Sequence, residues 1–341
     1  MPPDPADRGP SVLADLVGLM TCHTVAAALR LGVFDVLAGG PLPVAELAAR
    51  TGTDPDALDV LLAPLTHAGY LDRIGDAYAA TPVAVRDLAE DGHWATVLPL
   101  WLAMVGAQWP DLDTAARTGV PPAGFYPWLD RNPAERELFH TLQHRLATGL
   151  AAEVVEVVDL PPGARALLDV GGGEGAFGIA FCAPHPALTA TVLDRPSVVG
   201  AGRERITAAG LADRMTMRAA DLAGELHERD QDVVLLCNVV HGFAADRARA
   251  LVAECARALR PGGILLVLET ADRPGDDPAP GAERAFTGFF DLHLWHSQGG
   301  RIHPVPTLVD WLTGAGCHVR RAPLPRHPGH ALLVATRVPP S

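Results

Sequence analysis

Residues 166–178 read Ala166-Leu-Leu-Asp-Val-Gly-Gly-Gly-Glu-Gly-Ala-Phe-Gly178, a short apolar run followed at once by glycines at 171, 172, 173 and 175. The apolar run has the length of a buried parallel strand, and a helix-like segment follows the glycines. Glycine lets the backbone turn tightly and lets a ligand approach without a Cβ in the way. Strand, glycine turn and helix are the context of a nucleotide-binding loop, although a tight turn without a ligand gives the same pattern.

Strand-like and helix-like segments alternate through the second half of the chain. The second strand ends at Asp194, 23 positions after Gly171, where a carboxylate can bond both hydroxyls of a ribose. This alternation predicts an α/β fold with a doubly wound parallel sheet. The expected strands are 166–170, 190–193, 215–219, 233–237, 264–269 and 331–336.

Polar residues gather at the carboxyl ends of these strands, where open α/β sheets bind their ligands. Asp194 would hold a ribose, and Asp221 would accept from the N6 group of an adenine that lies against Leu222. A site lined by acids suits S-adenosylmethionine, which has no phosphates, better than NAD. Alternatively, Asp194 and Asp221 could each cap a following helix. The strand-end residues are Gly171, Gly173, Asp194, Asp221, Leu222, Asn238, His241 and Glu269.

Composition and charge limit the class of protein. The 341 residues are 48% hydrophobic and 20% charged, which predicts a globular chain with room for two domains. A net charge of −13 argues against nucleic-acid and membrane-surface partners, and we expect no stretch long enough to span a bilayer. Five scattered cysteines without C-x-x-C spacing predict reduced, mostly buried thiols in a cytoplasm.

The N-terminal part has a winged-helix pattern. A helix over 11–31, with Ser11 as N-cap, is apolar around most of its circumference, which predicts burial against a second subunit. Two short helices and a hairpin at 70–78 follow. The second short helix is acidic and has no basic residue, so phosphates would repel it and we expect a dimerisation module.

We therefore divide the chain into four parts. They are a disordered tail (1–10), a winged-helix dimerisation domain (11–95), a helical linker contributing to the substrate pocket (96–160) and a domain that binds S-adenosylmethionine (161–341). In the linker, Trp101 and Met104 are candidate pocket residues, although such side chains are more often core. His140 and His144 stand one helical turn apart but lack the glutamate of an H-E-x-x-H motif, which favours solvated or core histidines over a metal pair.

Six short motifs follow one another in the chain: Leu168-Asp-Val-Gly-Gly-Gly-Glu-Gly175, Leu193-Asp194, Asp221-Leu222, Asn238-Val-Val-His241, Arg260-Pro-Gly-Gly263 and the stretch 291–301. Together they resemble the caffeate/hydroxyindole type of small-molecule O-methyltransferase, over residues from about 11 to 337. The ordered set is specific, whereas the glycine run alone is not. The resemblance implies a homodimer, S-adenosylmethionine as methyl donor, and a small-molecule substrate held between the helical and catalytic domains.

The resemblance also implies roles for single residues. Gly171 and Gly173 match the donor loop, Asp194 the ribose acid, and Asp221 with Leu222 the adenine contacts. His241 matches a catalytic base that takes a proton from a phenol, and Glu269 matches an acid flanking that base. An imidazole with a pKa of about 6.5 is suited to this transfer.

The chain departs from the family pattern around the substrate. His-Asp-Trp is replaced by His241-Gly-Phe243, and Gly-Gly-Arg-Glu-Arg-Thr by Gly299-Gly-Arg-Ile-His-Pro304, so a second orienting acid becomes Ile302. His293 falls at a position that usually faces the substrate. Gln298 falls at another pocket position, and Gln143 stands where a pocket methionine is common.

These departures favour a metal-assisted hypothesis. His241 and His293 would hold a divalent metal, iron or zinc, with His296 as a third candidate ligand. The metal would activate a 2-oxo acid for methylation at its β-carbon, as in a small C-methyltransferase branch of the family that the His pair resembles. The alternatives are a phenol or hydroxyl O-methyltransferase with His241 as base, a winged-helix ligand sensor, and a protein that binds the donor without transferring methyl. Arg131 and Arg145 are candidates for the substrate carboxylate, or surface charges.

Overall fold

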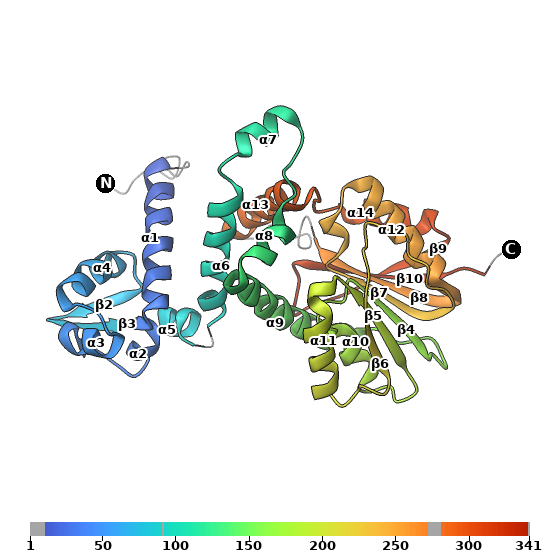
Figure 1. The fold of residues 1–341 in the computed structure, drawn as a ribbon, viewed down its shortest axis with the longest axis horizontal. Helices are drawn as coiled ribbons and strands as arrows, with labels where there is room; N and C mark the ends of the chain where they lie inside the picture. The colour runs from blue at the N-terminus through green and yellow to red at the C-terminus, as the bar shows by residue number, and fades with distance from the viewer. Residues whose placement is uncertain (1–10, 91, 272–280, 340–341) are drawn as a thin grey trace. The chain divides into compact units, whose positions relative to one another are not determined.

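The computed structural model describes residues 11–90, 92–271 and 281–339 (Figure 1). The predicted tail at 1–10 lies outside these residues. By its internal contacts the chain forms two compact units, one made of residues up to 109 with 134–139, the other of residues 110–133 with those from 140 onward.

The first unit has the three helices and the hairpin that the sequence predicted over residues 11–78, together with two short helices and a short strand that it did not predict. Ser11 caps the first helix, because its Oγ accepts the Ala14 N–H at 3.2 Å, and Asp54 caps the fourth through the Ala57 N–H at 2.9 Å. Gly75, with φ of +66°, turns the hairpin. The winged-helix assignment stays a prediction. The elements are α1 (Val12–Arg30), α2 (Val33–Leu37), α3 (Val44–Thr51), α4 (Pro55–His67), α5 (Pro82–Leu88) and α6 (His93–Gln108), with an antiparallel sheet in the order β1 (Leu42–Pro43), β3 (Ala77–Ala80), β2 (Leu71–Ile74).

Helix α1 packs into this unit only through its C-terminal part. Val25 and Ala28 are buried, whereas the apolar side chains Leu13 and Met20 are 71% and 58% exposed. By length and composition alone, α1 could cross a membrane, so the prediction that no stretch is long enough is wrong. An exposed apolar face of this size calls for a covering partner.

The second unit contains a seven-stranded sheet in the order β6-β5-β4-β7-β8-β10-β9. Its first five strands are parallel. The strands are β4 (Ala166–Val170), β5 (Thr189–Asp194), β6 (Met215–Ala219), β7 (Gln231–Cys237), β8 (Leu259–Thr270), β9 (Cys317–Ala322) and β10 (His330–Arg337). The helices are α7 (Leu112–Thr118), α8 (Phe125–Arg131), α9 (Pro133–Val157, shared with the first unit), α10 (Ala176–Cys182), α11 (Pro196–Ala208), the 3₁₀ turn η2 (Val240–Gly242), α12 (Ala245–Ala258), α13 (Gly281–Gln298) and α14 (Val305–Gly314).

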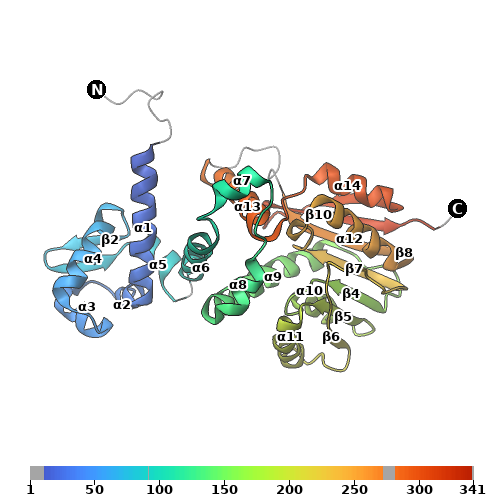
Figure 2. The same cartoon turned by 45° about the horizontal axis from the view of Figure 1, so that its top comes forward.

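Both faces of the sheet are buried, as expected for parallel strands covered by helices. Successive residues of β4 point to opposite faces: Leu167 packs with α10 and α11, and Leu168 with α12 and α14. Figures 1 and 2 show these two pairs of helices on opposite sides of the strands. The carboxyl ends of the parallel strands are thereby held at one edge of a rigid core.

The sheet differs from the prediction at one end. Strand β9 was missed, because only Cys317 and Ala322 are buried in it and the residues between give no apolar run. Strand β10 is antiparallel to both β8 and β9. The connection over 323–329 is too short for the helical crossover that a parallel pair needs. The sheet is therefore mostly parallel, with an antiparallel pair at one edge.

All five cysteines are free thiols, and Cys182, Cys237, Cys255 and Cys317 are buried. Burial raises the pKa of each of these four thiols. The prediction that the cysteines are mostly buried is confirmed.

Candidate active site

The glycine loop passes close under the loop after β7. A Cβ at Gly171 would lie 2.6 Å from the Val239 Cγ2 atom, and the φ of Gly171 is +70°, so a larger residue would both clash and be strained. The Gly171 N–H donates to the Leu193 carbonyl at 2.8 Å, which ties the loop to the end of β5. The predicted strand, glycine turn and helix are confirmed.

Asp194 meets the same loop from the end of β5. Its Oδ2 accepts the Gly173 N–H and its Oδ1 the Arg195 N–H, each at 2.7 Å. Burial raises the pKa of Asp194, against the lowering effect of these two hydrogen bonds. The helix-cap alternative is wrong here, because α11 has Arg195 as N-cap and no side-chain cap bond.

Asp221 and Leu222 follow β6, the strand next to β5 in the sheet. The Asp221 Oδ1 accepts the Ala223 N–H at 2.9 Å, a turn contact rather than a helix cap, since β7 is the next element. A Cβ at Gly171 would lie 3.2 Å from the Leu222 Cδ1 atom. The structure thus brings Gly171, Asp194 and the Asp221-Leu222 pair to one edge of the sheet.

Asn238 follows β7 and lies in the left-handed region, with φ of +56°. Its side-chain Oδ1 is buried and has no hydrogen-bond partner among the described residues. Buried polar atoms are normally satisfied, so an unpaired acceptor beside a glycine loop suits a ligand that carries a donor group. The residues at this edge therefore fit a nucleoside with hydroxyl and amino groups.

His241 lies in the turn η2 and is held by Glu269 from the end of β8. The Glu269 Oε1 accepts the Val239 and Val240 N–H groups at 2.9 and 2.6 Å, and its Oε2 lies 2.5 Å from the His241 Nδ1. An ionised carboxylate only accepts, so Nδ1 carries the proton and Nε2 is left as an acceptor. This arrangement resembles a base held by an orienting acid.

Aromatic side chains of α13 lie beside His241. The Phe290 ring lies edge-on, 5.8 Å from the His241 ring, and Phe286 stacks on Phe290 at 6.4 Å. His293 is buried on the same helix, with its ring 5.9 Å from that of Phe125. Burial, with the charge of His296, lowers the pKa of His293 to about 4, so this imidazole is neutral at neutral pH.

The departures from the family pattern have structural counterparts. A Cβ at Gly242 would lie 3.2 Å from the Gln298 Oε1, so the amide of Gln298 occupies space beside the base loop. Ile302 is buried, and its N–H donates to the Asp291 Oδ1 at 2.6 Å. His296 is fully buried, with its Nε2 3.2 Å from the Asp111 Oδ1.

Comparison with known proteins gives two family matches. Residues 15–89 match the O-methyltransferase dimerisation domain, and residues 115–316 match the O-methyltransferase domain. The chain belongs to the O-methyltransferase family. It is an S-adenosylmethionine-dependent methyltransferase of small molecules, and its dimerisation domain supports a homodimer.

Three relatives indicate the range of the family. This O-methyltransferase is 31% identical to a 3-hydroxy-5-methyl-1-naphthoate 3-O-methyltransferase of Streptomyces sahachiroi, over 97% of this chain and 96% of the relative. It is 33% identical to the aclacinomycin 10-hydroxylase RdmB of Streptomyces purpurascens, over 92% and 86%. The solved structure of NcsB1, an O-methyltransferase from neocarzinostatin biosynthesis with S-adenosylhomocysteine and 1,4-dihydroxy-2-naphthoic acid, superposes with a TM-score of 0.75 at 27% identity, covering 98% of this chain and 99% of that one.

Other predicted pocket residues of the O-methyltransferase lie further along the chain. Trp101 and Met104 are on α6 of the first unit, where Met104 is buried and Trp101 partly buried. Gln143 is exposed on α9 of the second unit, as are Arg131 on α8 and Arg145 on α9. Their roles at the substrate stay predictions.

The structure also supplies a carboxylate that the sequence did not place. Glu174 of the glycine loop lies with its oxygens 3.6 Å from the His144 Nδ1 and 4.0 Å from the His140 Nδ1, and it accepts from the Arg205 Nε at 3.0 Å. Glu174 is about 30 residues from each of these partners in the sequence, so a pattern of neighbouring residues could not predict these contacts. Within the described ranges, no group of three or more His, Cys, Asp and Glu side chains could hold a metal ion.

Proposed function

We propose that this O-methyltransferase methylates a phenolic or hydroxyl oxygen of a small aromatic metabolite, with His241 as general base. The observation that carries the proposal is the hydrogen bond between the His241 Nδ1 and the Glu269 Oε2, at 2.5 Å. Glu269 is fixed in turn by two backbone N–H groups, so its free rotation is removed. Such a base is needed for a phenol, whose ordinary pKa of about 10 keeps it protonated at neutral pH.

The donor site would use the residues at the edge of the sheet. Bound S-adenosylmethionine supplies an electrophilic methyl group on a sulfonium centre. Asp194 would accept from the ribose hydroxyls, and Asp221 from the adenine amino group with Leu222 against the ring. Gly171 and Gly173 give the backbone room for the ligand, and the unpaired Asn238 Oδ1 would accept from one of its donor groups.

The protein's part in the acceptor chemistry is a proton transfer. The Nε2 of His241 would take the hydroxyl proton, which leaves the substrate oxygen with a lone pair for bond formation. Glu269 accepts from the Nδ1–H throughout, so its charge stabilises the imidazolium that forms. Loss of the proton makes the oxygen a stronger nucleophile toward the methyl carbon, and the low dielectric of the partly buried turn strengthens the His–Glu interaction.

A flat aromatic acceptor fits the side chains around the base. Phe290 and Phe286 offer stacked ring surface beside His241. Two of the three relatives named above act on or bind a hydroxynaphthoate, which is a flat phenolic acid. His293, Gln298 and His296 would then line the acceptor site, and the buried, neutral His293 could donate a hydrogen bond to a substrate oxygen.

Metal-assisted C-methylation of a 2-oxo acid is the second candidate. One observation favours it: His293 is neutral at neutral pH, as an imidazole ligand must be. One weighs against it: the described residues offer no third His, Cys, Asp or Glu ligand to complete a site. The contact between the His241 Nδ1 and Glu269 is compatible with either role, because it leaves Nε2 free for a proton or a metal. We therefore place oxygen methylation first and derive no step through a metal.

The proposal includes the assembly and its setting. The exposed apolar residues of α1 overlap the matched dimerisation domain, so a second copy is the partner we propose for them. The acidic α4 and the net charge of −13 weigh against the ligand sensor that binds DNA. The free, buried cysteines suit a reducing cytoplasm.

The test compares His241→Asn with His318→Asn, a control on the exposed side of β9. Both variants and the wild type receive S-adenosylmethionine with 1,4-dihydroxy-2-naphthoate, and product mass and S-adenosylhomocysteine are measured. We expect the control to form methylated product at the wild-type rate, and His241→Asn to lose at least about 100-fold in rate while still binding S-adenosylhomocysteine. A fully active His241→Asn enzyme would contradict the proposal, and donor binding without any methylated product in the wild type would favour the rival that does not transfer methyl.

A further inference from the structure

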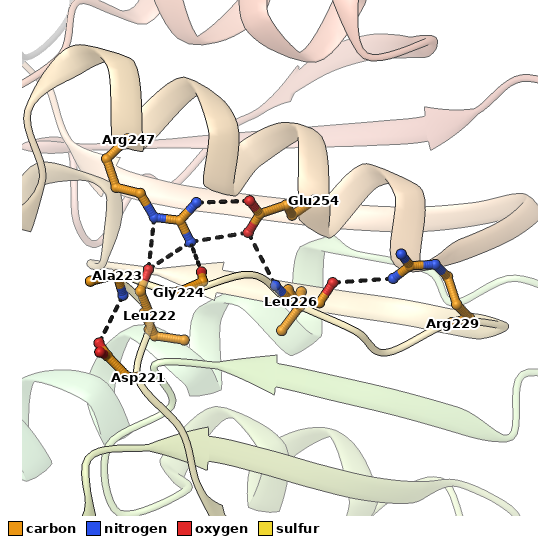
Figure 3. A network of polar contacts seen from close by, with 8 residues as sticks. All are labelled: Asp221, Leu222, Ala223, Gly224, Leu226, Arg229, Arg247 and Glu254. Atoms are coloured by element: carbon orange, nitrogen blue, oxygen red, sulfur yellow. Dashed lines mark hydrogen bonds and ion pairs between the residues drawn. The ribbon is translucent and has the colours of Figure 1, made fainter.

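Arg247 of α12 reaches across to the loop that carries Asp221 and Leu222 (Figure 3). Its Nε and Nη2 donate to the Leu222 carbonyl at 2.9 and 2.6 Å, and Nη2 also donates to the Gly224 carbonyl at 2.5 Å. These two carbonyls are 25 and 23 residues away in the sequence. One guanidinium therefore holds two points of the loop after β6.

Glu254 lies two helical turns further along α12 and holds Arg247 in place. Its Oε1 accepts from Nη1 at 2.8 Å and its Oε2 from Nη2 at 3.0 Å, a two-pronged contact. The same Oε2 accepts the Leu226 N–H at 3.3 Å, so Glu254 fixes a third point of the loop. Burial would raise the pKa of Glu254, but hydrogen bonds from Arg247 and its charge lower it below the ordinary value.

The backbone contacts decide where the two side chains of the loop lie. The Leu222 carbonyl is directed at Arg247, while the Leu222 side chain lies next to Gly171. The Asp221 carboxylate is exposed and is fixed through its Oδ1 by the Ala223 N–H, in the segment between the two carbonyls that Arg247 holds. A shift of this segment would move both the acid and the apolar side chain relative to the glycine loop.

We propose that Arg247, oriented by Glu254, is a positioning residue for adenine recognition. It fixes the loop 221–226 so that Asp221 meets the amino group of the donor's adenine and Leu222 meets the ring. The inference rests on the proposed adenine site at Asp221 and Leu222. A planar guanidinium can bond both carbonyls and the carboxylate at once, whereas the single ammonium of a lysine cannot keep this fork geometry.

The test measures how well the enzyme distinguishes two ligands that differ at the adenine amino group. S-adenosylhomocysteine has this group, and S-inosylhomocysteine carries an oxygen in its place. Calorimetry gives both dissociation constants for the wild type, Arg247→Lys, Asp221→Asn and Arg229→Lys. Arg229 serves as the matched control, because it donates to the Leu226 and Glu228 carbonyls at the far end of the same segment.

We expect the wild type to prefer the amino ligand, and Arg247→Lys to lose about 3- to 10-fold of that preference, the range of one hydrogen bond that is no longer well placed. The KM for S-adenosylmethionine should rise, while kcat at saturating donor stays within about twofold of wild type. Arg229→Lys should match the wild type in all three quantities. A purely structural role for Arg247 would lower the melting temperature and leave the preference unchanged.

Failure of the inference and failure of the proposed adenine site give different results. If Asp221→Asn loses the preference and Arg247→Lys keeps it, the site stands and the positioning role of Arg247 is wrong. If Asp221→Asn keeps the preference, the adenine site itself is wrong. Should Arg247→Lys fail to fold, Glu254→Gln replaces it. That amide keeps one acceptor for Arg247, and an unchanged preference in the folded Glu254→Gln protein would equally overturn the inference.

Discussion

Replacing Glu269 by glutamine changes one oxygen to an amide group and leaves the shape of the side chain intact. If the amide oxygen stays on the Val239 and Val240 N–H groups, which Oε1 accepts at 2.9 and 2.6 Å, the –NH₂ group faces the His241 Nδ1. Nδ1 must then accept, so the imidazole proton moves to Nε2 and the base can no longer take one. If the amide is reversed, –NH₂ faces two backbone N–H groups.

The reversed orientation leaves two N–H groups in a buried turn without an acceptor, at a cost of about 1–3 kcal/mol each. The first orientation is therefore favoured, and it holds His241 in the wrong tautomer. General-base catalysis contributes about 10²–10⁴-fold to rates, and the corresponding acid-to-amide change in serine proteases costs about 10⁴-fold. We expect Glu269→Gln to lower kcat by about 10²–10⁴-fold with unchanged affinity for S-adenosylhomocysteine.

The assay uses a series of hydroxynaphthoates and phenols of decreasing pKa, with product detected by mass. A phenol that is already ionised needs no base, so the deficit of Glu269→Gln should shrink as the pKa of the acceptor falls. Glu156→Gln, an exposed change on α9, is the control for the same chemical substitution. A deficit of the same size for every acceptor, or no deficit for an unactivated naphthol, would refute the assignment of His241 and Glu269 as base and orienting acid.

Three further predictions concern the donor, the buried acid and the dimer. Asp194→Ala should weaken S-adenosylhomocysteine binding by roughly 1–3 kcal/mol through lost ribose bonds, and a calorimetric titration with unchanged affinity would oppose this role. Burial raises the pKa of Asp169 to about 7 in the folded protein, from 3.8 for an ordinary aspartate such as that of the unfolded chain. The neutral carboxyl therefore contributes its full stability to the fold below pH 3.8, and this contribution is lost as the pH rises through about 7. Asp169→Asn should therefore gain stability relative to wild type between about pH 4 and 8, by at most about 4 kcal/mol, and parallel urea-unfolding curves at the two pH values would contradict it. On α1, charged aspartates in place of the exposed Leu13 and Met20 should turn a dimer into a monomer in light scattering, whereas an intact dimer would place the interface elsewhere.

Most of the sheet could be predicted from the sequence, because buried strands and glycine turns each produce a recognisable pattern over a few consecutive residues. The apolar runs of β4 and β7 predicted two strands of the sheet. The spacing from Gly171 to Asp194 predicted that the glycine loop and this acid lie at the same ligand site, and the Gly173 N–H indeed donates to the Asp194 Oδ2 at 2.7 Å. Strand β9 could not be predicted, because it lies at the edge of the sheet, where few of its residues are buried, and its sequence therefore has no run of apolar residues.

Contacts between distant segments were beyond a single sequence. Arg247 and the Leu222 carbonyl are 25 residues apart, and Glu174 and Arg205 are 31 residues apart. Neither pair produces a periodic pattern, and an arginine on a helix is ordinarily read as a solvated charge. The approach of Glu269 to His241 was expected only through the family resemblance, and the contacts that fix Glu269 come from backbone N–H groups, which no residue type reveals.

The measurement that tests the central claim most directly is the site of the transferred methyl group. The enzyme, treated with a chelator or supplied with iron or zinc, is incubated with methyl-¹³C S-adenosylmethionine and either 1,4-dihydroxy-2-naphthoate or a panel of 2-oxo acids, and the products are read by NMR. We predict a ¹³C-methoxy group on the phenolic acceptor, formed equally well after chelation, and no product from the 2-oxo acids. A ¹³C-methyl group on the β-carbon of a 2-oxo acid, lost with chelation and restored with metal, would contradict the account.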